Sequence, residues 1–253
     1  MPVYQHLDKP AEIKAAKAKM PVAYLPLGIL EWHGLHNPAG LDGVKAEGVA
    51  SFLADKFGGV VQPSLFWGDH RAEICELVFE PSQVTAATFD HTLPICEGIG
   101  YDKQALVDNA RRSGKNGGWR LWEELLVHVL FELESFGYKC VVAIPGHYPL
   151  FGPLDRAIAA YQAQDGTCDV YPLKDTMYDD TGTSGDHAAK FETSLMLALR
   201  PELVDLSRLS PDLTQPNIGV LGEDPRTEAS ADFGRKILDK FAALVEARMK
   251  NHY

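Results

Sequence analysis

The chain has 253 residues, of which 45% are hydrophobic and 23% are charged. This balance excludes a collagen-like repeat, a coiled coil or a disordered tail as the main architecture. The 35 acidic and 24 basic residues give a formal net charge of −11, which disfavours nucleic acid and anionic membrane surfaces as partners.

In chain order, the first predicted elements form a β-loop-α-β unit. Residues 11–20 fit a short helix, and residues 22–27 fit a buried strand that ends at Gly28. Apolar residues at helical spacing predict a helix over 44–57, and residues 60–66 fit a second strand. The segment that follows the first strand is GILEWHGLHNPAGLDG.

The second half alternates helices and strands in the same way. Helices are predicted over 119–136, 154–161, 188–200 and 233–249, and strands over 140–144 and 168–173. The second-half strand that begins at Cys140 is continuously apolar, as in a strand covered on both faces, and it ends in PGHYP. The alternation predicts one α/β domain, 1–253, with a mostly parallel sheet and helices on both faces. The irregular stretch at about 68–118 is interpreted as an insertion or lid.

Two segments that follow predicted strands carry side chains that suit a metal ion. Glu31 and His33 are two residues apart, so their side chains point the same way in an extended segment. Asp42 can return to them after the turn at 37–40, and His147 follows the predicted strand at 140–144, a neighbouring strand of the sheet. In proteins with a parallel sheet, bound molecules and ions lie beyond the carboxyl ends of the strands. Taken alone, each of these residues is more often a solvated loop residue, or a histidine whose hydrogen bonds are satisfied, than a metal ligand. Taken together, they indicate a hydrolytic zinc, manganese or iron site.

A further acidic residue lies on a predicted apolar stripe. Glu192 shares its helix face with Leu195 and Leu199, where a carboxylate needs a metal ion or a positive partner. A metal role and an ion pair with Arg200 or another base both stay open. His187, just before this helix, is interpreted as a proton donor or as a polar residue at the helix start.

The motifs resemble those of one known family. The string PLGILEWHGLHNPAGLD resembles the creatininase (creatinine amidohydrolase) motif, P-x-G-x-x-E-x-H-G-x-H-L-P-x-x-T-D, and DHAAKFETSLMLALRPELV and IPGHYPL resemble two later segments of that family. The motifs stay in register from about residue 20 to 206. The resemblance implies an α/β fold around a dinuclear metal centre, commonly assembled as a hexamer. It also implies that Glu31 and His147 bind one metal ion, that His33 binds the second, and that Asp42 bridges them.

This chain departs from the family pattern near the second metal ion. Creatininase supplies a glutamate two residues after the strand-end histidine, where this chain has Pro149. The resemblance to members with glycine at that position implies that Glu192 supplies the carboxylate instead. Pro145 replaces an asparagine, and Ala189 and Lys190 replace the glycine and first glutamate of H-A-G-E. These changes leave the substrate open.

The leading hypothesis is a metal-dependent hydrolase in which a metal-bound hydroxide cleaves a small amide or cyclic amide. His187 would protonate the leaving group, and Tyr148 would donate a hydrogen bond to the oxyanion or simply pack. Glu192 would act as a metal ligand, or as a general base in a mononuclear site. Two alternatives stay open. The first is a hydrolase that opens an oxidised cyclitol of the 3-dehydro-scyllo-inosose type by carbon-carbon cleavage in inositol catabolism, and the second is a degenerate metal- or sugar-binding protein.

The remaining expectations concern cofactors, partners and location. We expect two divalent metal ions per chain (Zn, Mn or Fe), a small-molecule substrate and a homo-oligomer. No secretory signal or membrane span is recognisable, so a cytoplasmic protein is expected. Candidate pocket walls are Trp32, Trp67 and Trp119, with core packing favoured for the last. Candidate substrate contacts, or solvated loop residues, are Asp69, His70, Arg71, His91 and Arg112. The cysteines form no CxxC pair and are expected as buried free thiols: Cys75, Cys96, Cys140 and Cys168.

Overall fold

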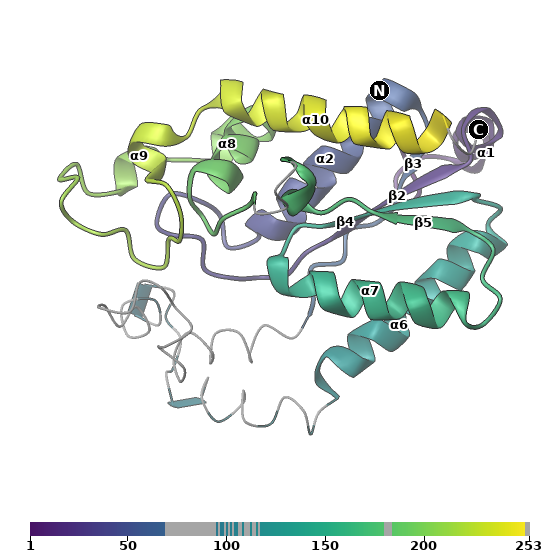
Figure 1. Ribbon diagram of the computed structural model, residues 1–253, viewed down its shortest axis with the longest axis horizontal. Helices are drawn as coiled ribbons and strands as arrows, with labels where there is room; N and C mark the ends of the chain where they lie inside the picture. The colour runs from purple at the N-terminus through teal and green to yellow at the C-terminus, as the bar shows by residue number, and fades with distance from the viewer. Residues whose placement is uncertain are drawn as a thin grey trace.

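A parallel sheet lies at the centre of the part of the chain that the structure describes. The structure is a computed structural model, and it describes residues 1–68, 117–179 and 184–250, together with scattered positions between 95 and 115. The described sheet has the strand order β1-β3-β2-β4-β5, and all its neighbouring strands pair in parallel. These strands are β1 (Val3–Tyr4), β2 (Val22–Leu27), β3 (Val60–Val61), β4 (Cys140–Pro145) and β5 (Asp169–Pro172) (Figure 1).

The two central strands fix the place where functional side chains gather. β2 and β4 pair along their whole length, from Val22 opposite Cys140 to Leu27 opposite Pro145. Both are buried at every position, as expected for parallel strands covered on both faces. Because they end in register, the chain leaves both strands at the same edge of the sheet.

Helices cover both faces of the sheet (Figure 1). One face carries α2 (Leu41–Phe57), α8 (Lys190–Leu199) and α10 (Ala231–Lys250). The other carries α6 (Gly118–Ser135) and α7 (Phe151–Gln162). The shorter elements are α1 (Pro10–Lys19), α9 (Pro225–Glu228) and the 3-10 turns η3 (Tyr148–Leu150), η4 (Asp175–Met177), η5 (Pro201–Leu203) and η6 (Leu206–Arg208). None of the described helices has the length and apolarity needed to cross a membrane.

The period of two along β2 divides its side chains between two cores. Val22 and Tyr24 pack into the core under α2, α8 and α10. Ala23 and Leu25 pack into the core under α6 and α7. The predicted α/β fold, with a parallel sheet and helices on both faces, is therefore confirmed.

Several predicted boundaries were wrong. The helix predicted over 44–57 begins at Leu41, so Asp42 lies in its first turn rather than in a returning loop. The strand predicted over 60–66 is limited to β3, and Leu65 then forms an isolated bridge to Leu27. Pro63 in between has no backbone N–H with which to continue the ladder. The edge strand β1 was not predicted, because two residues give no periodicity.

Some predictions concern residues that the structure does not describe. The insertion or lid at about 68–118 lies almost wholly outside the described residues, and it stays a prediction. Cys140 and Cys168 are buried free thiols, as predicted. Cys75 and Cys96 lie outside the described residues.

Candidate metal centre

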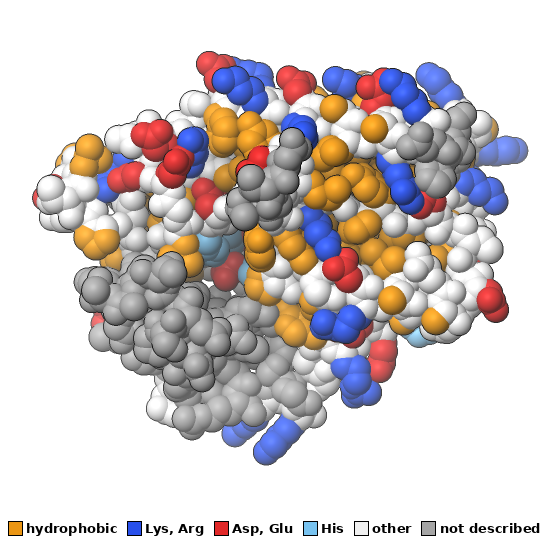
Figure 2. Space-filling view, in the orientation of Figure 1, with side chains coloured by type: hydrophobic (Ala, Val, Ile, Leu, Met, Phe, Trp, Pro, Cys, Tyr) orange, Lys and Arg blue, Asp and Glu red, His pale blue; other side chains and the backbone are white. Residues whose placement is uncertain are grey.

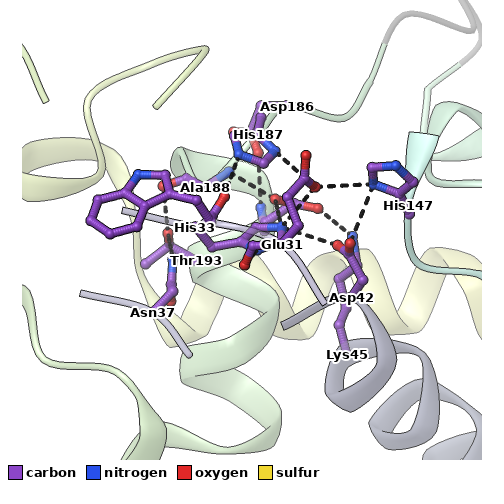
Figure 3. A network of polar contacts seen from close by, with 12 residues as sticks. Glu31, His33, Asn37, Asp42, Lys45, His147, Asp186, His187, Ala188 and Thr193 are labelled. Carbon is purple, nitrogen blue, oxygen red and sulfur yellow. Dashed lines mark hydrogen bonds and ion pairs between the residues drawn. The ribbon is translucent and has the colours of Figure 1, made fainter. Parts of the chain in front are cut away.

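Five candidate side chains converge from four places in the fold. Glu31 and His33 follow β2, His147 follows β4, Asp42 stands in the first turn of α2, and Glu192 in that of α8. Their donor atoms, with one from His187, form three groups whose atoms lie within 4.8 Å of one another. The first is Glu31 with Asp42 and His147, the second is His33 with Asp42 and Glu192, and the third is Glu31 with His33 and His187. Figure 3 shows the histidines and carboxylates around Asp42.

Two glycines let the backbone close around Asp42. A Cβ atom on Gly28, at the end of β2, would lie 2.2 Å from the backbone nitrogen of Gly43. A Cβ atom on Gly146, at the end of β4, would lie 2.1 Å from the carbonyl oxygen of Asp42. Both distances are shorter than van der Waals contact allows, so only glycine permits this approach. The ends of both central strands thus press against the start of α2.

The carboxylate of Asp42 faces two histidines with its two oxygens. Oδ1 lies 3.1 Å from Nε2 of His33, and Oδ2 lies 3.3 Å from Nδ1 of His147. Oε2 of Glu31 lies 3.1 Å from the same His147 nitrogen. All of these side chains are buried, and Asp42 is fully so. This is the arrangement that a carboxylate bridging two cations would need.

The donor atoms fit divalent metal ions. Nδ1 of His33 lies 3.2 Å from the carbonyl oxygen of Glu31, which accepts its hydrogen, so Nε2 of the neutral ring presents a lone pair to Asp42. Among the described residues, Nε2 of His33, both carboxylate oxygens of Asp42 and Oε2 of Glu31 are buried without a hydrogen-bond partner. Buried acceptors that face one another need a proton or a cation between them.

The electrostatics of the site without a metal ion support the same conclusion. Burial lowers the pKa of His33, but the carboxylates of Asp42, Glu192 and Glu31 outweigh it and raise that pKa to about 9. Burial also lowers the pKa of His147, and Glu31 and Asp42 raise it to about 10. Protons therefore occupy the positions that a metal ion would take, as expected of a preformed site.

The surroundings of Glu192 suit both of the roles that the sequence left open, a metal ligand and an ion pair. Its Oε2 lies 3.7 Å from Nε2 of His33, within the second group of donors. Its Oε1 accepts a hydrogen bond of 2.6 Å from Nζ of Lys45, which also donates to Oδ2 of Asp175 at 2.8 Å. The positive partner is therefore Lys45, and Arg200 pairs with Glu202 instead.

Sequence analysis missed Lys45 and Asp175. Lys45 is 1% exposed, and burial lowers its pKa, but Asp175, Glu192 and Asp42 outweigh this and raise it above the ordinary value. A signal was present, because Lys45 lies four residues before Val49 on the apolar face of α2. A lysine on a buried helix face requires an acidic partner.

His187 lies beside Glu31 and His33 and is the partly exposed histidine of the site. Its Nε2 lies 2.8 Å from the carbonyl oxygen of Trp32, which accepts its hydrogen, and its Nδ1 lies 3.8 Å from Oε2 of Glu31. Its ring stacks on that of His33, with 4.6 Å between the centroids. The side chain is 22% exposed, and Figure 2 shows histidine side chains in a hollow of this face.

Backbone contacts hold the His187 segment in place. His187 exchanges two N–H to carbonyl hydrogen bonds of 2.9 Å with Leu221, from a segment that the sequence analysis did not assign. Asp186 accepts hydrogen bonds from the N–H groups of Phe191 and Glu192 in the first turn of α8. Burial, together with the charge of Glu192, raises the pKa of Asp186 to about 7.

A histidine that the sequence analysis missed joins the two motif segments. His36 is buried, and its Nε2 lies 3.0 Å from the carbonyl oxygen of Ala188 and 3.1 Å from Oγ1 of Thr193. Burial lowers its pKa to about 4, so the ring is neutral near pH 7. The repeated histidine of the H-G-x-H string was the available signal.

The remaining candidates lie outside the cluster. Tyr148 is 54% exposed, and its ring packs against Phe151 at 4.7 Å, so its oxyanion role stays a prediction. Trp32 is buried and donates from Nε1 to Ile218, while Trp67 is exposed. Trp119 packs against the core under α6 and α7, as favoured. Arg112 is exposed, and the other predicted substrate contacts lie outside the described residues: Asp69, His70, Arg71 and His91.

Comparisons with known proteins converge on one family. Residues 119–248 match the family model Creatininase, described as creatinine amidohydrolase. A creatinine amidohydrolase from Pseudomonas putida is 28% identical over an alignment of 229 residues, which covers 82% of this chain and 76% of the relative. A crystal structure of creatinine amidohydrolase (creatininase) has a TM-score of 0.67 at 21% identity, covering 100% of this chain and 98% of that one. A structure described as "Creatininase Mn" has a TM-score of 0.64 at 23% identity, covering 100% and 99%. The solved structures share the fold of this chain.

Proposed function

The chain belongs to the creatininase family of metal-dependent hydrolases, and from this premise we propose that it cleaves or opens a small amide or cyclic amide. The observation that carries the proposal is the carboxylate of Asp42, whose two oxygens face His33 and His147 at 3.1 and 3.3 Å in a buried space. Such a carboxylate suits a pair of metal ions better than a single ion.

The proposed ligand sets follow from the first two groups of donors. Glu31 and His147 would hold one divalent ion, His33 and Glu192 would hold the second, and Asp42 would be shared by both. Mixed oxygen and nitrogen donors suit zinc, manganese or iron. When bound, two such ions polarise a substrate carbonyl and lower the pKa of a bound water.

His187 is the proposed proton carrier. The carbonyl oxygen of Trp32 accepts the hydrogen of its Nε2, so Nδ1 is the nitrogen that exchanges protons with water and substrate. Nδ1 takes a proton from the attacking water and returns it to the leaving nitrogen. Its partly exposed position, unlike that of the five ligands, gives it access to substrate.

A second candidate function is the opening of an oxidised cyclitol by carbon-carbon cleavage. It is favoured by Pro149, which stands in the 3-10 turn after His147 where creatininase has a glutamate. The second group of donors is completed by Glu192 instead, so the surroundings of the substrate differ from those in creatininase. An assembly of several copies, as the resemblance implies, is proposed for either function.

Elemental analysis and product analysis together test the proposal. The purified protein is reconstituted with zinc, manganese or iron and assayed for metal atoms per chain. It is then incubated with creatinine, other lactams, formamides and keto-cyclitols. About two ions per chain and a released amine or opened lactam are expected. An open-chain keto acid would establish the cyclitol reaction instead, and an absence of bound metal would overturn the metal centre. Metal binding without any turnover would point to a degenerate binding protein.

A further inference from the structure

A lysine is buried directly behind the candidate metal centre. The side chain of Lys45 is 2% exposed, and its Nζ lies 2.6 Å from Oε1 of Glu192 and 2.8 Å from Oδ2 of Asp175. A buried ammonium group is unfavourable unless acceptors replace its water, and a cation cannot bind a metal ion. Lys45 therefore acts on the centre through its carboxylate partners.

Helix α2 places Lys45 in a fixed relation to Asp42. The two residues are three positions apart and lie on the same face of the helix. Asp42, in the first turn, faces His33 and His147, and Lys45 reaches Glu192 from the following turn. One rigid helix thus sets both the proposed bridging carboxylate and the partner of Glu192.

The two oxygens of Glu192 have different partners. Oε1 is held by Lys45, and Oε2 accepts the N–H of Ala188 at 2.7 Å and lies 3.7 Å from Nε2 of His33. A carboxylate group is planar and rigid, so the contact of Lys45 with Oε1 and that of Ala188 with Oε2 together fix the direction of Oε2. Glu192 consequently presents one oxygen, in one orientation, toward His33 and Asp42.

We propose that Lys45 is a positioning residue that holds Glu192 as a single-oxygen ligand of the second metal ion. Asp175 completes the contact by engaging the same ammonium group from η4, which follows β5. This inference rests on the proposed function, because it assumes the metal centre. Since Pro149 removes the carboxylate that creatininase places after the strand-end histidine, the second ion depends on Glu192 and on the residue that holds it.

The test replaces Lys45 by Met, which keeps an unbranched stem but removes the ammonium group. The matched control is Lys174→Met, because Lys174 pairs with Asp155 at the surface. Each protein is reconstituted with zinc, freed of excess metal and analysed for metal atoms per chain. We expect Lys45→Met and Glu192→Gln each to lose the second ion, while the control keeps the wild-type content. The increase in melting temperature on adding zinc should be smaller for Lys45→Met and Glu192→Gln than for the wild type and for Lys174→Met.

Cobalt substitution tests positioning separately from folding. Lys45→Gln can still donate one hydrogen bond to Glu192, so it replaces Lys45→Met in both measurements if the Met variant does not fold. The visible absorption of bound Co²⁺ reports its coordination, and we expect Lys45→Gln to shift it while Lys174→Met leaves it unchanged. Adding Glu192→Gln to a Lys45 variant should cause no further loss of metal, because both changes act on one ligand.

The outcomes separate this inference from the proposed function. A wild-type protein that binds no metal after reconstitution would overturn both. A wild-type protein that binds metal, with Lys45 variants equal to it in metal content and cobalt spectrum, would overturn only the role of Lys45.

Discussion

Nε2 of His187 lies 2.8 Å from the carbonyl oxygen of Trp32, although the two residues are 155 positions apart in the sequence. The carbonyl oxygen can only accept a hydrogen bond, so this contact selects the tautomer in which Nδ1 is free. Nδ1, which lies 3.8 Å from Oε2 of Glu31, is therefore the nitrogen proposed to exchange protons.

His187→Gln should therefore lower kcat without removing metal. The glutamine amide can still donate to Trp32 but cannot titrate, so we expect kcat to fall about 10²- to 10⁴-fold, with metal atoms per chain unchanged. His128→Gln, at an exposed position of α6, is the matched control. Steady-state kinetics on the substrate identified by product analysis, with elemental analysis of the same sample, checks this. An undiminished kcat would exclude His187 as the proton carrier.

Asp42→Asn should remove both metal ions and the activity together. The amide has nearly the shape of the carboxylate but has no charge, and it cannot offer an anionic oxygen to both His33 and His147. Metal atoms per chain, measured beside turnover, provide the readout. Asp55→Asn, an exposed position on the same helix, should keep both properties. Retention of two ions by Asp42→Asn would rule out the bridging role.

Ala188 should tolerate glycine but not valine. Its φ is +54°, a region that costs a non-glycine residue free energy, and its side chain is fully buried. A β-branched residue adds strain and volume, so we expect Ala188→Val to lower the free energy of unfolding by about 2 kcal/mol or more. Ala188→Gly should stay within about 1 kcal/mol of the wild type. Urea denaturation of the metal-free proteins measures both, and equal stability of the two variants would contradict the prediction.

Glu134 should stabilise the fold in a pH-dependent way. It accepts hydrogen bonds from the hydroxyl of Tyr161 and from Oγ1 and N–H of Thr167, which hold its pKa below the ordinary value. A lowered folded-state pKa stabilises the protein above the unfolded-state pKa of about 4.3, and this contribution disappears as the pH falls through the folded-state value.

Glu134→Gln provides the corresponding measurement. The difference in free energy of unfolding between wild type and variant should be constant near neutral pH and should shrink once the pH falls below about 4.3. Urea denaturation at a series of pH values follows it. Glu132→Gln, at an exposed position of the same helix, should show no such change. A difference that does not vary with pH would refute the prediction.

The local pattern of apolar residues predicted most of the strands and helices. The apolar run 22–27 became β2 with the same bounds, and the stripe over 119–136 became α6 with a shift of one residue at each end. Periodicity succeeds there because burial on one or both faces imposes it on neighbouring residues. It failed at the start of α2, where Gly40 and Gly43 have low helix propensity and packing against the end of β2 decides the boundary.

The sequence by itself determined which residues stand at the ends of two buried strands, and hence that Glu31, His33 and His147 meet at one edge of the sheet. The tertiary structure alone decided that Lys45 pairs with Glu192 across 147 positions, and that Leu221 holds His187. Such contacts depend on how α2, α8 and the 217–222 segment pack over the strand ends. No local periodicity encodes these pairings, because the two partners of each lie in segments that are far apart in the sequence.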